Sequence, residues 1–300
     1  MSLREGKDNL NFGERSDHAQ KRGKNTDRWR LIIVNIAIGL VIVIIALSVK
    51  AIVLDKKADE KQTKDHREMA AATVAPSATS AAVATPEPQG ADRWLRKDLD
   101  PNKPMVALTF DDGPYTKVTR RILKALKKDD GRVTFFVVGN RVETYAETLK
   151  MAYDQGNQIA SHTYDHGDLS KMNEKQIKKE IDKTNKAVSK VIGCDTTALR
   201  PPFGNVSQKM RKTIPVSMFY WSLDSEDWKS RNVDCILKRC KKVEDGEIIL
   251  MHDLYPTTAK AVEKLVPKLT KQGFQLVTID ELLYYKGIKA KSGKVYYSGR

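Results

Sequence analysis

An uncharged run of 19 residues, Leu31–Val49, limits what this chain can fold into more than any other feature. The run reads LIIVNIAIGLVIVIIALSV, and a helix of this length, rising about 1.5 Å per residue, crosses a hydrocarbon core of roughly 30 Å. A buried core helix is the alternative, but no amphipathic segment precedes the run to cover it. We therefore predict a single transmembrane helix, which excludes one globular domain for the whole chain.

The flanks of this run bear on processing and orientation. About thirty residues precede it, and it exceeds the roughly 7–15 apolar residues of a cleaved signal peptide. An uncleaved signal anchor is therefore favoured, with cleavage near Ala46-Leu47-Ser48 as the alternative. Lys and Arg are more frequent in the cytoplasmic flank of a membrane span. Residues 1–30 contain eight of them and residues 50–67 contain six, so the count favours a cytoplasmic N-terminus only weakly.

The segments around the span are not expected to form a folded domain. Residues 1–30 are predicted to be a cytoplasmic tail, and residues 50–100 a charged stalk followed by an Ala/Thr/Pro linker. The linker, residues 70–91, contains three prolines and only two larger apolar side chains, Val74 and Val83. Such a segment buries too little surface to offset its ordering entropy, so we predict a flexible connection to residues 101–300.

Residues 101–300 alternate between short β-branched or aromatic runs and amphipathic stretches. This alternation predicts an α/β domain with a parallel sheet, open or closed into a barrel, and with its chemistry at the carboxyl ends of the strands. Seven strands are predicted, at residues 105–110, 133–138, 158–162, 197–200, 216–222, 247–252 and 274–279.

Three of the five histidines lie in this region, and each falls at the end of a predicted strand. His162 and His166 are four residues apart, a spacing that allows two imidazoles to share a metal ion. His252 ends an apolar run and, taken alone, is equally well interpreted as a buried structural histidine. The pattern therefore indicates a site at the strand ends without fixing its chemistry.

Carboxylates and an arginine gather at the same kind of position. Asp111 and Asp112 follow the first strand in a DDGP sequence, which taken alone is an ordinary turn. The segments 200–204 and 224–228 follow two further strands. Polar motifs at five strand ends indicate one shared site.

In this order, TFDDGP, SHTYDH, LRPPFG, DSEDW and LMH resemble the five motifs of the polysaccharide deacetylase family, carbohydrate esterase family four. The resemblance covers roughly residues 102–285. It implies a distorted (β/α) barrel of about seven parallel strands. It also implies metal-dependent removal of N- or O-acetyl groups from sugars.

The resemblance implies Asp112, His162 and His166 as ligands of one divalent metal ion, with Zn expected and Co, Mn or Ni as alternatives. One carboxylate and two imidazoles leave positions on the ion open, where the pKa of a water falls from about 15.7 toward 7. Asp111 is implied as the base that takes this water's proton. These residue types suit amide hydrolysis independently of the family.

The remaining roles are also implied by the resemblance. Arg200 would pair with Asp111, and His252 would be the general acid, its cationic form favoured by Asp227. Trp228 and Leu250 would line a pocket for the acetyl methyl group.

Phe203 belongs to the same substrate pocket and departs from the family, which usually has Tyr there. We expect a backbone N–H of the turn 202–204 to share in stabilising the oxyanion. Because the expected donor is the backbone, the substitution should not abolish activity.

The implied substrate is an acetylated glycan of the cell surface, and such a substrate requires an extracellular catalytic domain on a single-pass cell-membrane anchor. This arrangement resembles the wall-modifying deacetylases of Gram-positive bacteria, whose usual substrate is peptidoglycan N-acetylglucosamine. The alternatives are N-acetylmuramic acid, poly-N-acetylglucosamine, chitooligosaccharide and acetylxylan, or a glycan-binding wall protein without catalysis. No obligate protein partner is evident.

The net charge of +15 is distributed unevenly along the chain. Residues 1–100 carry 17 basic and 14 acidic residues, so residues 101–300 carry 36 and 24, a net +12. This excess suits residence among the anionic polymers of a bacterial wall rather than binding to nucleic acid. A solvated lysine-rich helix, residues 175–186, explains part of the excess without any partner.

Two further expectations concern the cysteines and the C-terminus. An odd number of cysteines in an oxidising compartment predicts one disulfide and one free thiol. Cys194 would pair with Cys235 or Cys240, since the latter two lie awkwardly for each other on a helix. Residues 286–300 read as a loose tail, with an edge strand at 295–297 as the alternative.

Overall fold

The computed structural model describes residues 95–300. The predicted cytoplasmic tail, the apolar run at 31–49 and nearly all of the predicted stalk lie outside the described residues, so these assignments stay predictions. Among residues 95–300, no helix combines the length and the apolar character that a membrane crossing requires.

The described part is an α/β domain in which all seven predicted strands are present. The strands are β1 (Met105–Asp111), β2 (Thr134–Val137), β3 (Gln158–Ser161), β4 (Ala198–Leu199), β5 (Ser217–Phe219), β6 (Leu223–Asp224), β7 (Glu247–His252), β8 (Gln275–Leu276) and β9 (Val295–Tyr296). The helices are α2 (Thr116–Lys127), α3 (Gly139–Val142), α4 (Ala146–Asp154), η2 (Leu169–Lys171), α5 (Glu174–Ile192), η3 (Pro202–Gly204), α6 (Gln208–Thr213), α7 (Asp227–Ser230), α8 (Val233–Arg239), α9 (Pro256–Lys271) and α10 (Ile279–Tyr285).

The strands form one sheet in the order β6-β7-β1-β2-β3-β4-β5-β9, with β8 also paired to β1. Each pairing between these strands is parallel. The parallel order predicted from alternating strands and helices is therefore confirmed. It brings the carboxyl ends of the strands to one edge.

The two ends of the sheet share one segment of chain. The predicted strand 216–222 contains β5, which pairs with β4, and it ends directly before β6, which pairs with β7. Ser222 lies between these two strands and donates its backbone N–H to the Ile248 carbonyl of β7 at 3.0 Å. The segment 217–224 thus curves the sheet back on itself, and the sheet forms a parallel (β/α) half-barrel.

Successive side chains of β1 point to opposite faces of the sheet and belong to two separate apolar cores. Val106, Leu108 and Phe110 belong to the core between the sheet and its outer helices, whereas Met105 and Ala107 belong to a second core with α10. A strand places successive side chains on opposite faces, so Asp111 lies on the same side as Met105 and Ala107. The last residue of β1 is therefore directed to the inside of the curved sheet.

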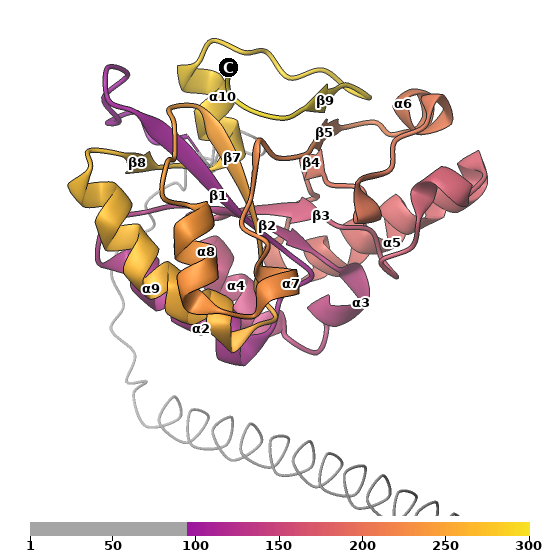
Figure 1. Cartoon of the computed structure of the whole chain (residues 1–300). Helices are drawn as coiled ribbons and strands as arrows, with labels where there is room; N and C mark the ends of the chain where they lie inside the picture. Colours follow the sequence, from indigo (N-terminus) through magenta and orange to yellow (C-terminus); the bar gives the residue numbers. More distant parts are fainter. Residues whose placement is uncertain (1–94) are drawn as a thin grey trace, which may run out of the picture. The chain divides into compact units, whose positions relative to one another are not determined.

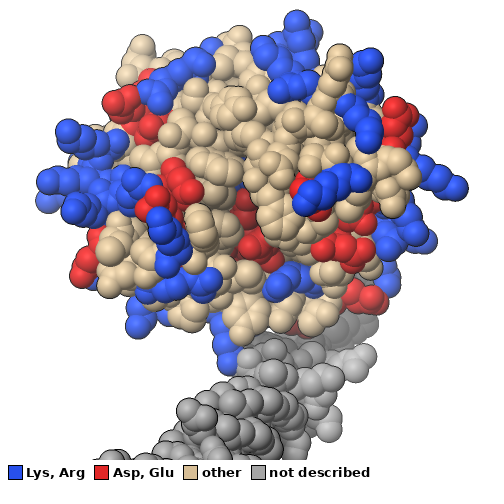
Figure 2. Space-filling model, turned by 45° about the vertical axis from the view of Figure 1, so that its right-hand side comes forward, with Lys and Arg blue, Asp and Glu red and all other residues tan. Residues whose placement is uncertain are grey.

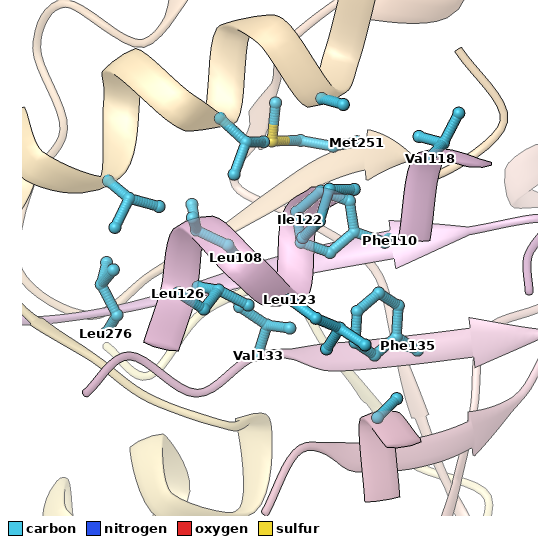
Figure 3. Close-up of a cluster of buried hydrophobic side chains, with 14 of the residues drawn as sticks. Leu108, Phe110, Val118, Ile122, Leu123, Leu126, Val133, Phe135, Met251 and Leu276 are labelled. Atoms are coloured by element: carbon cyan, nitrogen blue, oxygen red, sulfur yellow. The ribbon is translucent and has the colours of Figure 1, made fainter. Parts of the chain in front are cut away.

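The outer core explains the predicted helix patterns. The apolar face of α2 is buried, and Figure 3 shows Ile122 and Leu123 of this helix beside Phe110 of β1 and Phe135 of β2. Helices α2 and α9 pack against each other in this layer, and Figure 1 shows them on the same side of the sheet as α4. Burial of these side chains fixes the strands whose ends carry the polar motifs.

The folded domain begins before its predicted limit at residue 101, and its last residues are part of the sheet. Arg96 is buried and pairs with Glu281, with 2.8 Å between Nε and Oε1, so the domain includes residues before 101. Of the two alternatives for residues 286–300, the edge strand is the one present: β9 lies at the edge of the sheet and pairs with β5, and Tyr296 stacks on Phe219. An antiparallel bridge then joins Ser298 to Glu247.

The predicted disulfide was also wrong, because the three cysteines are free thiols. Cys240 is enclosed in the outer apolar core, where burial raises the pKa of its thiol to about 12. Cys194 Sγ instead lies 3.5 Å from the hydroxyl of Tyr153, while Cys235 is exposed on α8. The three side chains thus occupy different surroundings.

The surface carries the positive charge that the composition predicts. Figure 2 shows Lys and Arg side chains around much of the outline of the face in view, with fewer Asp and Glu side chains among them. On α5, Lys175, Lys178, Lys179 and Lys186 are exposed. The lysine-rich helix expected from the sequence is thus a solvent-facing surface in the described domain.

Candidate active site

Parallel pairing gathers the polar motifs at one edge of the sheet. Asp111 and His252 are register partners at the ends of β1 and β7. Ser161 of β3 is the register partner of Leu199 of β4, so the segments that follow these two residues also begin side by side. His162 and Arg200 are the first residues after those two strands. Four residues from distant parts of the sequence therefore meet because their strands end together.

The predicted metal ligands form a compact group. Asp112 Oδ1 lies 3.5 Å from His162 Nε2 and 3.1 Å from His166 Nε2. One ligand atom from each of the three residues lies within 4.8 Å of the others. Asp112 and His166 adopt left-handed backbone conformations, with φ of 73° and 55°, which turn their side chains toward this point. The structure thus brings together the three residues that the sequence placed there.

The charge states of these ligands suit a divalent cation. Burial opposes ionisation of Asp112, but its contact with His166 and the nearby His162 and His252 outweigh burial and lower its pKa to about 2. Burial lowers the pKa of His162, against the opposing effect of Asp111 and Asp112. A charged carboxylate and a neutral imidazole are the forms that bind metal.

Two observations test whether a metal ion fits here. Asp112 Oδ1 is buried and has no hydrogen-bond partner, which is costly unless a cation satisfies it. His162 Nδ1 lies 2.7 Å from the carbonyl oxygen of Arg200, so this nitrogen carries the proton and Nε2 keeps its lone pair for a ligand bond. The residues present therefore fit a divalent ion bound by one carboxylate and two imidazoles.

The predicted base is held by the predicted arginine. Arg200 is fully buried and donates from Nη1 to Asp111 Oδ1 at 2.7 Å and to Thr109 Oγ1 at 2.8 Å. Its other nitrogens donate to the carbonyls of Phe219 and Tyr220. Because Asp111 Oδ1 is fixed in this way, the second oxygen, Oδ2, faces the metal group, 3.7 Å from His162 Nε2.

The predicted acid is held by the predicted aspartate. Asp227 is fully buried, and its Oδ1 lies 2.8 Å from His252 Nδ1 while its Oδ2 accepts the backbone N–H of His252 at 2.8 Å. Burial alone would lower the pKa of His252, but the hydrogen bond and charge of Asp227, with Asp111 and Asp112, raise it to about 9. The imidazole is therefore cationic at neutral pH and can donate a proton.

The predicted substrate-pocket residues differ in exposure. The exposed ring of Phe203 lies 5.1 Å from the ring of His166, edge to face, on a backbone with φ of 62°. Trp228 is also exposed, and its backbone N–H donates to Asp227 Oδ1 at 2.8 Å. Leu250 is buried in β7, two residues before His252. All three lie beside groups of the site, while their contact with substrate stays a prediction.

The sequence did not single out two threonines that complete these hydrogen-bond networks. Thr258 of α9 donates to Asp227 Oδ2 at 2.6 Å, and Thr109 accepts from Arg200. Thr109 shares the inward face of β1 with Asp111, so the strand alternation would have identified it. No spacing in the sequence links Thr258 to Asp227.

A third polar residue that the sequence did not single out is Asp253, directly after His252. It is fully buried and accepts from Thr119 Oγ1 at 2.5 Å. Burial, with the nearby charges of Asp112 and Asp111, raises its pKa to about 7. The carboxyl packs so closely on Gly113 that a Cβ there would lie 2.2 Å from it, which requires glycine in the DDGP turn.

Comparison with known proteins gives the same family as the motifs do. A family model described as polysaccharide deacetylase matches residues 98–215. The chain is 41% identical over 185 residues to the peptidoglycan-N-acetylmuramic acid deacetylase PdaC of Bacillus subtilis, covering 61% of this chain and 40% of that protein. It is 40% identical over 193 residues to the peptidoglycan-N-acetylglucosamine deacetylase PgdA of Listeria monocytogenes, covering 64% and 41%. The chain therefore spans about two fifths of the length of these relatives.

A solved structure is similar over nearly its whole length. The structure of the T48 deacetylase with substrate is 38% identical to this chain, with a TM-score of 0.63. The similarity covers 66% of this chain and 99% of that one. The parallel (β/α) fold described above is therefore shared with that deacetylase.

Proposed function

This chain belongs to the polysaccharide deacetylase family, and from that membership we propose that it hydrolyses N-acetyl groups of a cell-wall glycan. The proposal rests on two residues that can transfer protons, Asp111 and His252, which end the neighbouring strands β1 and β7. Asp111 with Arg200 and His252 with Asp227 lie beside a group of three metal-ligating side chains. Amide hydrolysis needs a base for water and an acid for the departing amine, and these pairs supply them.

Asp112, His162 and His166 would hold the metal ion, for which Zn is proposed and Co, Mn or Ni are alternatives. A divalent ion supplies Lewis-acid chemistry, polarising the acetyl carbonyl and lowering the pKa of water. The chain contributes one negative charge and two neutral imidazoles to this site, so the ion keeps a net positive charge for that task.

Asp111 is proposed as the general base. Arg200 holds Oδ1, so Oδ2 is the oxygen available to take the proton of the attacking water. Three further hydrogen bonds, to Thr109 and to the carbonyls of Phe219 and Tyr220, hold the Arg200 guanidinium in place, so its bond to Oδ1 positions the carboxylate before substrate binds. Such preorganisation lowers the barrier because no reorientation is needed during proton transfer.

His252 is proposed as the general acid. Asp227 engages Nδ1, so the proton on Nε2 is the one available to the amine nitrogen as the C–N bond breaks. The pKa of about 9 keeps His252 charged through the neutral range. Loss of that proton to the amine leaves a neutral imidazole and releases the sugar amine and acetate.

The turn at 202–204 and two apolar side chains would bind the acetyl group. The backbone N–H of Phe203 is the proposed partner for the developing oxyanion, since Pro202 has no N–H and that of Gly204 donates to the Pro201 carbonyl. Trp228 and Leu250 would contact the methyl group, because both lie within two residues of the acid pair Asp227 and His252.

Peptidoglycan N-acetylglucosamine is the proposed sugar, and N-acetylmuramic acid is the main alternative. Both sugars appear in the names of the relatives that are 40% and 41% identical to this chain. Poly-N-acetylglucosamine, chitooligosaccharide and acetylxylan are less favoured alternatives. The experiment that separates wall glycan from these other substrates measures acetate and free amine released from purified wall, chitooligosaccharide and acetylxylan, with and without a chelator.

A non-catalytic glycan-binding protein is the competing class of function. The variants Asp111→Asn and His252→Ala separate the two, because they remove the base and the acid while preserving the bulk of the fold. Loss of acetate release with retained glycan binding supports the enzyme. Unchanged properties in both variants, together with no metal binding by the wild type, would exclude it.

We also propose that the catalytic domain is extracellular and held at the cell membrane by residues 31–49. The proposal rests on the length and apolar composition of that run and on the location of the proposed substrate. Protease treatment of intact cells tests it: the domain should be cleaved from the surface. Replacing residues 31–49 with a cleavable signal sequence should release it into the medium.

A further inference from the structure

We propose that Glu180 is a positioning residue of the metal centre, which holds the loop between His162 and His166 and thereby fixes where His166 lies. The inference rests on the metal site of the proposed function and adds a residue that none of the five motifs contains. Glu180 is 14 residues beyond His166, in the middle of α5, and is buried with 7% of its surface exposed.

The contacts of Glu180 go to the backbone of that loop. Its Oε2 accepts the backbone N–H of Tyr164 at 3.0 Å and that of Asp165 at 2.9 Å. A buried carboxylate is costly unless its oxygens are hydrogen-bonded, and bonds to a charged acceptor are about twice as strong as neutral ones. The two bonds therefore fix the peptide units 163–164 and 164–165, which lie between His162 and His166.

The loop needs such support because its backbone is unfavourable by itself. Thr163 and His166 have φ of 67° and 55°, in the left-handed region that non-glycine residues adopt at a cost. Only three residues separate the two imidazoles, and both nevertheless face Asp112. Without external bonds, the segment would relax to conformations that separate the ligands.

The two histidines differ in how their rings are held. His162 Nδ1 is fixed by the carbonyl of Arg200. Within residues 95–300, Nδ1 of His166 makes no comparable hydrogen bond. The His166 ring instead contacts the rings of His162 and Phe203. The position of His166 is therefore set by its backbone, and the Glu180 bonds act on that backbone.

The helix that carries Glu180 is itself firmly placed. A capping box between Asn173 and Gln176 defines its first turn, and Ile177, Ile181 and Val188 are buried beneath it. Lys183, one turn after Glu180, extends over the ring of Tyr164 with 4.5 Å between Nζ and the ring centroid. The loop is thus attached to a rigid element rather than to another loop.

The test measures metal affinity rather than activity. Zn²⁺ affinity of the metal-free, full-length protein is determined by competition with a chromophoric chelator for the wild type, Glu180→Ala and Glu180→Gln. We expect Glu180→Ala to weaken binding about 10- to 100-fold, the range typical of residues that orient metal ligands. Glu180→Gln keeps an acceptor oxygen without the charge, and should lose less.

Asp182→Ala is the matched control, because Asp182 is an exposed acid on the same helix, two residues away. It removes the same charge and should bind Zn²⁺ as the wild type does. The visible spectrum of the Co²⁺-loaded protein gives a second readout, since a displaced His166 changes the ligand field. We expect an altered spectrum for Glu180→Ala and an unaltered one for Asp182→Ala.

Circular dichroism of the metal-free variants separates positioning from folding. If Glu180→Ala does not fold, Glu180→Gln decides: a folded variant with weaker Zn²⁺ binding supports the inference. Wild-type affinity and an unchanged Co²⁺ spectrum in the folded variants would overturn it. If the wild type itself binds neither ion, the proposed metal centre is wrong, which is a different result from equal binding by all variants.

Discussion

Arg200 and Asp111, 89 residues apart in the sequence, form a buried ion pair with 2.7 Å between Nη1 and Oδ1. The guanidinium also lies over the ring of Phe136, 4.2 Å from its centroid. The planar guanidinium of Arg200 therefore donates to several groups at the strand ends at once. Lysine cannot reproduce these contacts, since it has no planar set of donors.

Arg200→Lys should accordingly reduce kcat by about 100-fold while leaving KM little changed, because the base is misplaced rather than removed. Arg200→Ala should in addition lower the free energy of unfolding by about 3–5 kcal/mol, since it leaves a buried carboxylate unpaired. Steady-state kinetics and thermal melts measure the two effects. A kcat of Arg200→Lys equal to that of the wild type would contradict the assigned geometry.

Asp227→Asn should move the alkaline limb of the pH–activity profile. In the wild type, the His252 pKa of about 9 keeps the acid protonated, so activity should fall only as the pH rises through that value. Without the Asp227 charge, burial dominates and the pKa returns toward or below its ordinary value of 6.5. We expect the limb to shift to lower pH and kcat to fall by about 10²- to 10⁴-fold at pH 8. Asp182→Asn serves as the control.

The same pair makes stability depend on pH. Because the folded-state pKa of His252 lies above the unfolded value, its contribution is fully present below about pH 6.5 and is lost as the pH rises through about 9. Melting temperatures of the metal-free protein between pH 6 and pH 10 should therefore fall more for the wild type than for His252→Gln. Equal slopes would show that the pair does not stabilise the charged imidazole.

Metal removal should abolish acetate release. Dialysis against a chelator should inactivate the enzyme without unfolding it, and adding back Zn²⁺, Co²⁺, Mn²⁺ or Ni²⁺ in turn identifies the ions that restore activity. His166→Ala should require a higher metal concentration for the same activity, since it removes one of three ligands. Undiminished turnover in chelator, after metal analysis has verified removal, would exclude the metal mechanism.

Phe203→Tyr restores the residue that the family usually has. Phe203 is 67% exposed, so the added hydroxyl should change the free energy of unfolding by no more than about 0.5 kcal/mol. If the backbone N–H is the oxyanion partner, kcat should change little. A large gain in kcat would instead assign a role to the phenol hydroxyl.

Thiol titration checks the free cysteines. Cys235 is exposed and should react first with an aromatic disulfide reagent. Cys240, whose thiol pKa burial raises to about 12, should react only after unfolding. The mass of the unreduced protein should match three thiols, and a loss of two protons would revive the predicted disulfide.

Residue type and strand position were sufficient to locate most of the site. Parallel strands end at one edge, so the polar residues that follow the strands had to meet, as Asp111 and His252 do. The sequence did not predict β6, because residues 216–222 appear as one continuous strand that ends before Leu223. The limits of β5 and β6 depend on their pairing with two different neighbours, β4 and β7.

The supporting contacts were less accessible to sequence reasoning. Thr258 and Glu180 come from helices whose periodicity explains only their buried apolar residues. Their hydrogen bonds depend on how α9 and α5 pack on the sheet, which no local pattern encodes. The disulfide prediction was wrong for a related reason, since cysteine count says nothing of which thiols a core will enclose.

The segment 217–224 that joins the two ends of the sheet has a chemical consequence. The carbonyls of Phe219 and Tyr220 in this segment accept hydrogen bonds from Arg200, which positions the base Asp111. Asp227, three residues after the segment, positions the acid His252. Base and acid are therefore aligned by one stretch of backbone. A displacement of that stretch would therefore move the Asp111 base and the His252 acid together, rather than one of them alone.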